Sequence, residues 1–274
     1  MGEEKKETAK NENLGSAVIL IVFIFIGVVL IFGIFFSGPR ADTLSCKDSK
    51  RSIAINRDLY SLCFNRETRQ PYWVLQILDQ RSFKSSQSGS PKDYLQDPEI
   101  PKSEQASEME YKHSHWVMGN FLFPFSKQDE ELSGESSQDQ YLFSVTSPQD
   151  PNFHKGYWEK LRDRVKTLSM KDRMLFNNHV AVLSGPLFLS KDGRTNKGIL
   201  GENQIPIPTY FFQVIAPTTN ANDIEAYIVP NEEISEAVSL DDFKVSIKEF
   251  EKKTKIKGVE SIANDLQVIV PVPM

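Results

Sequence analysis

Three histidines have the residue type and spacing for metal binding or acid–base chemistry. His113 and His115 lie two positions apart, and His154 follows later in the chain. In a strand, His113 and His115 would share one face, from which they could converge on His154. Three imidazoles suit Zn²⁺ or another transition metal better than Mg²⁺, which prefers oxygen ligands. The commoner alternative is that they are ordinary histidines, exposed or hydrogen-bonded.

A cationic helix predicted within residues 155–173 is a second candidate surface. Trp158, Leu161, Val165 and Leu168 recur at helical spacing and predict one buried face. Five cations lie at other positions of this segment, against Glu159 and Asp163: Lys155, Lys160, Arg162, Arg164 and Lys166. A solvated face explains this pattern, and the alternative is a surface for phosphates or an acidic partner.

Residues 14–36 contain no charged side chain and predict one transmembrane helix. The stretch exceeds the roughly 20 residues that cross a hydrocarbon core. A cleaved secretory signal would have a shorter apolar region followed by small residues. Lysines or arginines flank both ends, so the positive-inside rule does not assign an orientation.

The composition is that of a folded chain of 274 residues with a net charge of −5. Nucleic-acid-binding proteins usually carry an excess of basic residues, and the net charge of this chain shows no such excess. Cys46 and Cys63 could pair in an oxidising compartment or remain free thiols, and the sequence leaves both open. We expect a polar N-terminus (1–13), the transmembrane helix (14–36), a linker (37–52) and one domain (53–270).

Strand and helix patterns within that domain predict an α+β fold, with helices packed on a central, mostly antiparallel sheet. The sequence predicts a hairpin formed by residues 53–64 and 71–78. It predicts surface loops at residues 82–110 and 127–139, and the loop at 127–139 is acidic. Further strands are expected at Tyr141–Val145, 179–183, 208–216 and 225–229, with helices opened by the prolines of 147–151 and over 243–254.

Five segments, in order, resemble those of the DNA/RNA non-specific endonuclease family. They begin with Leu62-Cys-Phe-Asn-Arg-Glu-Thr-Arg-Gln-Pro-Tyr-Trp-Val and Val180-Ala-Val-Leu-Ser-Gly-Pro-Leu-Phe, which resembles a strand ending in Thr-Gly-Pro. The others are Ile207-Pro-Thr-Tyr-Phe-Phe-Gln-Val-Ile, Ala226-Tyr-Ile-Val-Pro-Asn and the helix over 245–256. The resemblance covers about residues 55–265 and implies the ββα-metal nuclease fold of mitochondrial endonuclease G-type enzymes.

The family's active-site motif is Asp-Arg-Gly-His, whose histidine acts as general base on a water. Residues 112–115 match this motif, so His115 falls on the catalytic histidine. Lys112, His113 and Ser114 replace the family's Asp, Arg and Gly. The resemblance therefore assigns His115 as a vestigial general base.

The family holds a single Mg²⁺ with an asparagine on the following helix, and the metal neutralises charge on the phosphate. Phe153, Trp158 and Leu161 match the packing positions of that helix. His154 stands at the asparagine's position, and Arg162 replaces an acidic residue. Packing residues match, whereas residues used only for chemistry do not.

These departures predict a degenerate, non-enzymatic site with no cofactor. If the site is instead active, it would hold Mg²⁺ or a transition metal, with His154 and His113 as candidate ligands. We therefore expect a structural or accessory subunit of a mitochondrial inner-membrane, respiratory-chain-like complex. Its domain would face the intermembrane space, and its partners would be membrane lipid and other subunits. The alternative function is an active, membrane-tethered, metal-dependent DNA/RNA endonuclease, for which nucleic acid is the partner.

Overall fold

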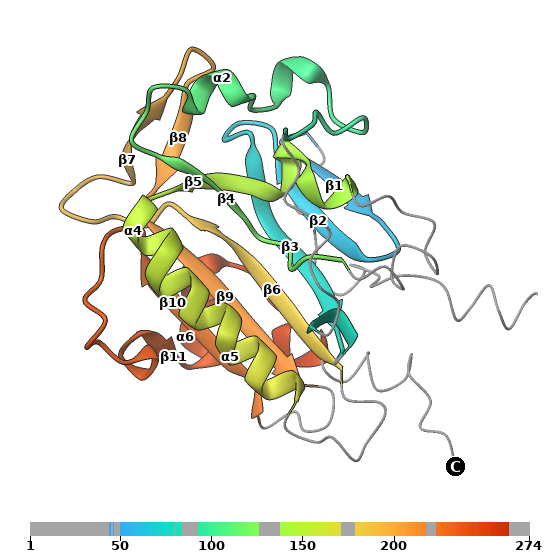
Figure 1. Ribbon diagram of the computed structural model, residues 1–274, viewed down its shortest axis with the longest axis vertical. Coiled ribbons are helices and arrows are strands. Elements are labelled where there is room, and N and C mark those ends of the chain that lie inside the picture. The colour runs from blue at the N-terminus through green and yellow to red at the C-terminus, as the bar shows by residue number, and fades with distance from the viewer. Residues whose placement is uncertain are drawn as a thin grey trace, which may run out of the picture. The chain divides into compact units, whose positions relative to one another are not determined.

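A computed structural model of the chain describes residues 44, 46, 50–79, 81–83, 93–125, 138–170, 179–217 and 223–262. At its centre is a seven-stranded sheet in the order β1-β2-β3-β6-β9-β10-β11, in which every neighbouring pair is antiparallel (Figure 1). The predicted α+β fold with a central antiparallel sheet is confirmed. The strands of this sheet are β1 (Ser52–Asn56), β2 (Tyr60–Asn65), β3 (Gln70–Leu78), β6 (Val180–Leu187), β9 (Tyr210–Pro217), β10 (Glu225–Pro230) and β11 (Lys244–Val245).

Two small antiparallel sheets and several helices complete the described part. The small sheets pair β4 (Val117–Asn120) with β5 (Thr146–Gln149) and β7 (Asn196–Leu200) with β8 (Ile205–Pro208). The α-helices are α2 (Glu108–Tyr111), α4 (Pro151–Phe153), α5 (Glu159–Ser169) and α6 (Ile247–Thr254), and α4 and α5 are joined by a π-helical stretch, η6 (His154–Trp158). Short 3-10 helices are η2 (Arg81–Phe83), η3 (Lys102–Glu104), η4 (Asp139–Tyr141), η5 (Phe143–Val145) and η8 (Leu240–Phe243).

The central strands are buried on both faces, because a helix covers each side of the sheet. Along β6, Val180 and Val182 pack into the cluster that includes helix α5. The intervening Ala181 and Leu183 pack into the cluster that includes Phe250 of α6. Side chains alternate across a strand, so an unbroken apolar run such as this one is what a doubly covered strand requires.

Helix α5 buries the face that its sequence predicts. Trp158, Leu161 and Val165 are at most 1% exposed and pack on the sheet. Burying each such side chain contributes about 1.5–3 kcal/mol. The helical segment begins at Pro151, and Asp150 caps it by accepting hydrogen bonds from two main-chain amides. The expected helix start is confirmed there, although residues 147–149 belong to strand β5.

Three expectations about local structure are corrected. Residues 53–64 contain two strands, β1 and β2, and it is β2 that pairs with β3 as the predicted hairpin. Residues 141–145 form 3-10 turns instead of a strand. The predicted surface loop 82–110 contains helix α2 and buried anchors, among them Asp97 and Gln105, which hydrogen-bond each other. Polar composition suggested a loop, but these polar groups satisfy one another inside the fold.

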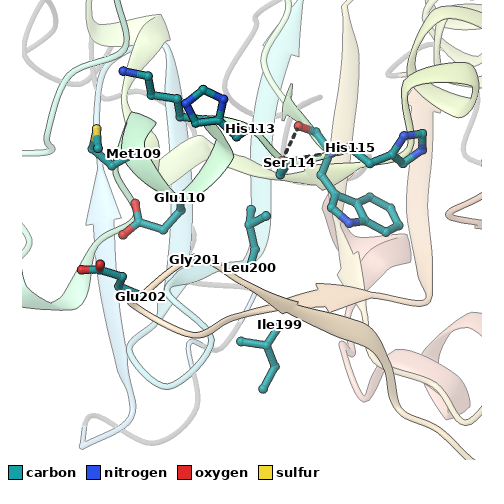
Figure 2. A pocket seen from close by; sticks show the side chains of 11 residues that line it. Met109, Glu110, His113, Ser114, His115, Ile199, Leu200, Gly201 and Glu202 are labelled. Carbon is teal, nitrogen blue, oxygen red and sulfur yellow. Dashed lines mark hydrogen bonds between the residues drawn. The ribbon is translucent and has the colours of Figure 1, made fainter.

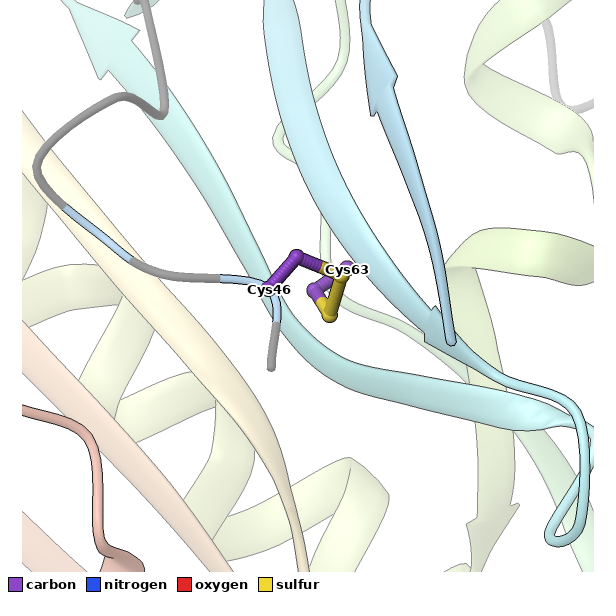
Figure 3. The surroundings of a disulfide bond; sticks show 2 residues. All are labelled: Cys46 and Cys63. Carbon is purple, nitrogen blue, oxygen red and sulfur yellow. A yellow bond between two sulfur atoms is a disulfide. The ribbon is translucent and has the colours of Figure 1, made fainter. Parts of the chain in front are cut away.

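The two cysteines form a disulfide, which resolves the question that the sequence left open. Cys46 is bonded to Cys63 of β2, with 5.4 Å between their Cα atoms (Figure 3). Leu44, two residues earlier, is 1% exposed and belongs to the same core cluster as Cys63. These two described positions of the predicted linker are therefore anchored on the domain.

The predicted N-terminus (1–13), transmembrane helix (14–36) and most of the acidic loop (127–139) lie outside the described residues. Within the ranges that the structure covers, no helix has both the length and the apolar character needed to cross a membrane.

Candidate functional site

The segment that carries His113 and His115 is a turn, so the prediction that they share one strand face is wrong. Helix α2 ends at Tyr111, and β4 does not begin until Val117. His113 adopts a left-handed conformation with φ 66°, a region where histidine is enriched among non-glycine residues. The two imidazoles consequently point to different sides of the turn (Figure 2).

The start of α2 explains why a helix and turn replace the expected strand. Ser107 and Glu110 form a capping box, in which Glu110 accepts hydrogen bonds from the main chain and hydroxyl of Ser107. Glu110 is 5% exposed and also accepts from the amide of Asn203. A capping box stabilises a helix start, and here it anchors α2 to the β7–β8 connection.

His115 pairs with a carboxylate that the sequence had not singled out. Its Nε2 lies 3.3 Å from Oδ2 of Asp150, and 67% of the His115 side chain is exposed. The other Asp150 oxygen, Oδ1, accepts from the main chain of Asn152 and Phe153 at the helix start. An imidazole oriented by a carboxylate is a general-base arrangement. Asp-Pro before an apolar helix marked Asp150 as a cap, but nothing local linked it to a histidine 35 positions away.

His154 is engaged by its neighbours and stays neutral. Its Nδ1 donates to Oε1 of Gln149 over 2.7 Å. Burial lowers the pKa of His154, and the positive charges of Arg162 and Lys155 lower it further. Gln149 is fully buried and lies against Gly119, where a Cβ atom would come within 2.0 Å of the Gln149 Cδ. The absence of a side chain at Gly119 therefore makes room for the amide that fixes the His154 ring.

Arg162 points inward, which corrects its predicted place on the solvated face of the helix. Only 18% of its side chain is exposed. Its Nη1 donates to the Leu122 carbonyl over 3.2 Å, and the guanidinium carbon lies 4.2 Å from the centre of the Phe123 ring. The carboxylate of Glu159 is 3.6 Å from Nε, but its own side chain is 54% exposed. Burial accordingly lowers the pKa of Arg162, although the guanidinium still keeps its charge at any physiological pH.

Other cations of the helix are also committed to contacts within the chain. Arg164 forms a two-pronged salt bridge with Glu225 of β10, at 2.6 and 2.8 Å. Lys160 donates to the main-chain carbonyl of Glu236. Of the predicted cationic face, Lys155 and Lys166 are the exposed members. Two residues make a small footprint for a phosphate backbone, where affinity grows with the number of charges neutralised.

The histidines of the predicted site line two different pockets. His113 and His115 border a hollow of about 520 Å³ between α2 and the β7–β8 connection (Figure 2). His154 and Arg162 line a cavity of about 180 Å³ whose other walls include Tyr94 and Asn120. His113, His115 and His154 therefore do not converge, and no group of three His, Cys, Asp or Glu side chains in the described ranges is placed to hold a metal ion.

The residues at the predicted metal position do not fit Mg²⁺. That ion prefers carboxylate and carbonyl oxygens together with its own waters. The cavity instead contains the Arg162 cation and the neutral imidazole of His154, whose Nδ1 is already bonded. The Nε2 amide of Gln149, buried without a partner among the described residues, is a donor and offers no lone pair. The fixed positive charge of Arg162 in this cavity repels a divalent cation.

Comparison with known proteins decides the family. Residues 40–264 match the family model of the DNA/RNA non-specific endonucleases. The chain belongs to this family.

Several of its relatives are mitochondrial nucleases. The mitochondrial nuclease of Saccharomyces cerevisiae is 29% identical over 223 residues, covering 76% of this chain and 65% of the yeast protein. Mitochondrial endonuclease G of Bos taurus is 25% identical over 214 residues, covering 76% of this chain and 69% of the bovine protein. The chain thus matches about two thirds of the length of each.

A solved structure shares the fold. EndoG, in its inhibitory complex with EndoGI, superposes with a TM-score of 0.62 at 23% identity, covering 74% of this chain and 84% of that one. The assignment of His115 and His154 to the family's catalytic and ligand positions remains a prediction from the sequence.

Proposed function

We propose that this protein is a catalytically inactive member of the family, kept for its folded surface and tethered to a mitochondrial membrane as an accessory subunit. The observation that carries the proposal is the cavity that pairs His154 with Arg162. By the family pattern an asparagine ligand and an acidic residue belong at these positions. A neutral imidazole and a buried cation there reverse the electrostatics on which a metal-dependent phosphodiesterase depends.

The test is cleavage of supercoiled plasmid and RNA by the full-length chain in neutral detergent, with Mg²⁺, Mn²⁺ and Zn²⁺ in turn. We expect no cleavage above that of His115→Ala, because the described residues near the histidine do not provide the ligands that a divalent metal needs. Calorimetric titration with Mn²⁺ should likewise show no binding by the wild-type chain. The double variant His154→Asn with Arg162→Glu, which recreates the family's donor set, should gain Mn²⁺ affinity.

Metal-dependent cleavage that His115→Ala abolishes would overturn the proposal. It would favour the second candidate, an active tethered endonuclease. One observation supports that candidate: the His115 side chain is 67% exposed, and Asp150 lies 3.3 Å from its Nε2, which orients the ring and leaves Nδ1 to accept a proton as a general base. In that case Asp150→Asn should reduce cleavage while leaving Mn²⁺ affinity unchanged.

Two findings support the proposed location. The relatives are mitochondrial proteins, and the Cys46–Cys63 disulfide is of the kind that persists in oxidising compartments. A domain in the intermembrane space, anchored in the inner membrane by residues 14–36, satisfies both. By the same analogy, its partners are then other subunits of a membrane complex of the respiratory-chain type.

Extraction of mitochondrial membranes tests the accessory role. After solubilisation in a mild detergent, we expect the chain to migrate on a native gel with a complex many times its own 31.2 kDa. Alkaline carbonate should leave it in the membrane pellet, because a transmembrane helix is not displaced as a surface-bound protein is. Migration as a free monomer, or release by carbonate, would refute the role of anchored subunit.

A further inference from the structure

The cavity around Arg162 has the features of a site for a small anion. It measures about 180 Å³ and is lined by Arg162 together with Tyr94, Tyr141 and Asn120. Helix α5 supplies the cation, and the first tyrosine comes from the segment before α2. Segments distant in the sequence thus bring hydrogen-bond donors to one small cavity.

Arg162 is not fully neutralised by its surroundings. Its interactions in the described part of the chain are the Nη1 bond to a carbonyl, the ring of Phe123 and the Glu159 carboxylate at 3.6 Å from Nε. A guanidinium has five N–H donors, and Nη2 donates to none of the described residues. Glu159 also lines the cavity, but its side chain is 54% exposed, so solvent screens its charge more than that of Arg162. A buried cation with spare donors favours an anionic partner.

Tyr94 adds a neutral donor beside the cation. Its hydroxyl oxygen accepts a long hydrogen bond of 3.5 Å from the Asn120 amide, which leaves the hydroxyl proton available. Burial raises the pKa of Tyr94, so the phenol keeps this proton at neutral pH. Its ring packs edge-on against Tyr141, with 5.9 Å between the ring centres. The phenol is therefore held in place as well as protonated.

We propose that this cavity binds a compact oxyanion, a phosphate or carboxylate group, which Arg162 holds through paired N–H donors and Tyr94 through its hydroxyl. The inference rests on the proposed loss of the metal site, because the cation that repels a metal ion attracts an oxyanion. Planar guanidinium groups match phosphate and carboxylate oxygens two at a time. A volume of about 180 Å³ is of the size of one such group, so the proposed ligand is a small molecule or one terminal group.

Titration with inorganic phosphate, and separately with acetate, tests the proposal on the full-length chain in neutral detergent. Calorimetry and thermal unfolding are measured at constant ionic strength set with chloride. We expect saturable binding and a raised Tm for at least one probe. Arg162→Met, which keeps the volume but removes the charge, should weaken binding about tenfold or more, and Tyr94→Phe should weaken it severalfold. Lys166→Met removes an exposed cation from the same helix and should leave binding unchanged.

The two probes distinguish the two possible ligand groups. Tighter binding of phosphate identifies a phosphate group as the ligand, and tighter binding of acetate identifies a carboxylate. Equal affinities of wild type and Arg162→Met, or equal losses in Arg162→Met and Lys166→Met, would overturn the proposal. Circular dichroism shows whether Arg162→Met folds. If it does not, unchanged binding of the probe by Tyr94→Phe would overturn the proposal instead. A chain that neither cleaves nucleic acid nor binds either probe refutes this inference alone, whereas metal-dependent cleavage refutes the proposed function.

Discussion

Asn231→Ala is expected to lower the free energy of unfolding by about 4 kcal/mol. The side chain is fully buried, and its amide donates to the carbonyls of Pro148 at 3.1 Å and Pro208 at 2.9 Å. Its oxygen accepts from the main-chain amide of Asp150 at 2.8 Å. Alanine removes the hydrogen bonds of two buried carbonyls and of one half-buried amide, and a buried polar group that loses its partner costs about 1–3 kcal/mol. Chemical denaturation of the full-length chain, at a fixed detergent concentration, measures the loss.

Asn152→Ala is the matched control. Its amide is exposed and donates to the Glu233 carboxylate at 3.2 Å, so its removal should cost about 0.5 kcal/mol or less. Because Asn231 holds the main chain of Asp150, the first substitution should also speed hydrogen exchange of the Asp150 amide. Equal stability losses in the two variants would show that the buried network does not connect β5, β8 and β10 as the structure indicates.

The strands and the buried face of helix α5 were predictable because their signal is local. Apolar runs such as 180–183 reflect burial of both faces of a strand, and the three-four-three spacing from Trp158 to Leu168 reflects burial of one helix face. Residues 141–145 carry the same apolar character and yet form 3-10 turns. Their neighbours bury them: Leu95 pairs with Leu142, and Phe143 packs beside Tyr94. Apolar residues thus indicate that a segment is buried, but only longer periodic segments indicate whether it is a helix or a strand.

The candidate site was less predictable, because its decisive contacts join residues far apart in the sequence. The replacement of an acidic residue by Arg162 was visible in the sequence, but its inward direction was not, since helical position alone suggested a solvated cation. The pairing of His115 with Asp150, and the room that Gly119 leaves for Gln149, depend on how β4 and β5 align. The register of strands sets these contacts, and no local pattern encodes it.

Gly185→Ala is expected to destabilise the chain by about 3 kcal/mol. Gly185 lies in the central strand β6, where an added Cβ would come within 2.6 Å of the Tyr72 carbonyl oxygen and 2.7 Å of the Phe212 ring. A main-chain oxygen cannot move aside without disturbing the pairing of β3 with β6, and Phe212 is fully buried. Overpacking of this kind typically costs about 1–3 kcal/mol, and the backbone clash places the site at the upper end.

Gly156→Ala in the helical stretch η6 provides the comparison, because nothing lies within 4 Å of its added Cβ. Alanine favours helix over glycine by up to about 1 kcal/mol, so this variant should be neutral or slightly more stable in the same denaturation experiment. Equal stabilities of the two variants would mean that the strand relaxes around the methyl group. The expected difference would instead show that the Ser-Gly-Pro segment, which matches the family pattern, is required for close packing of β6. A match in such segments identifies the fold, and it is compatible with the loss of chemistry that we propose at His154 and Arg162.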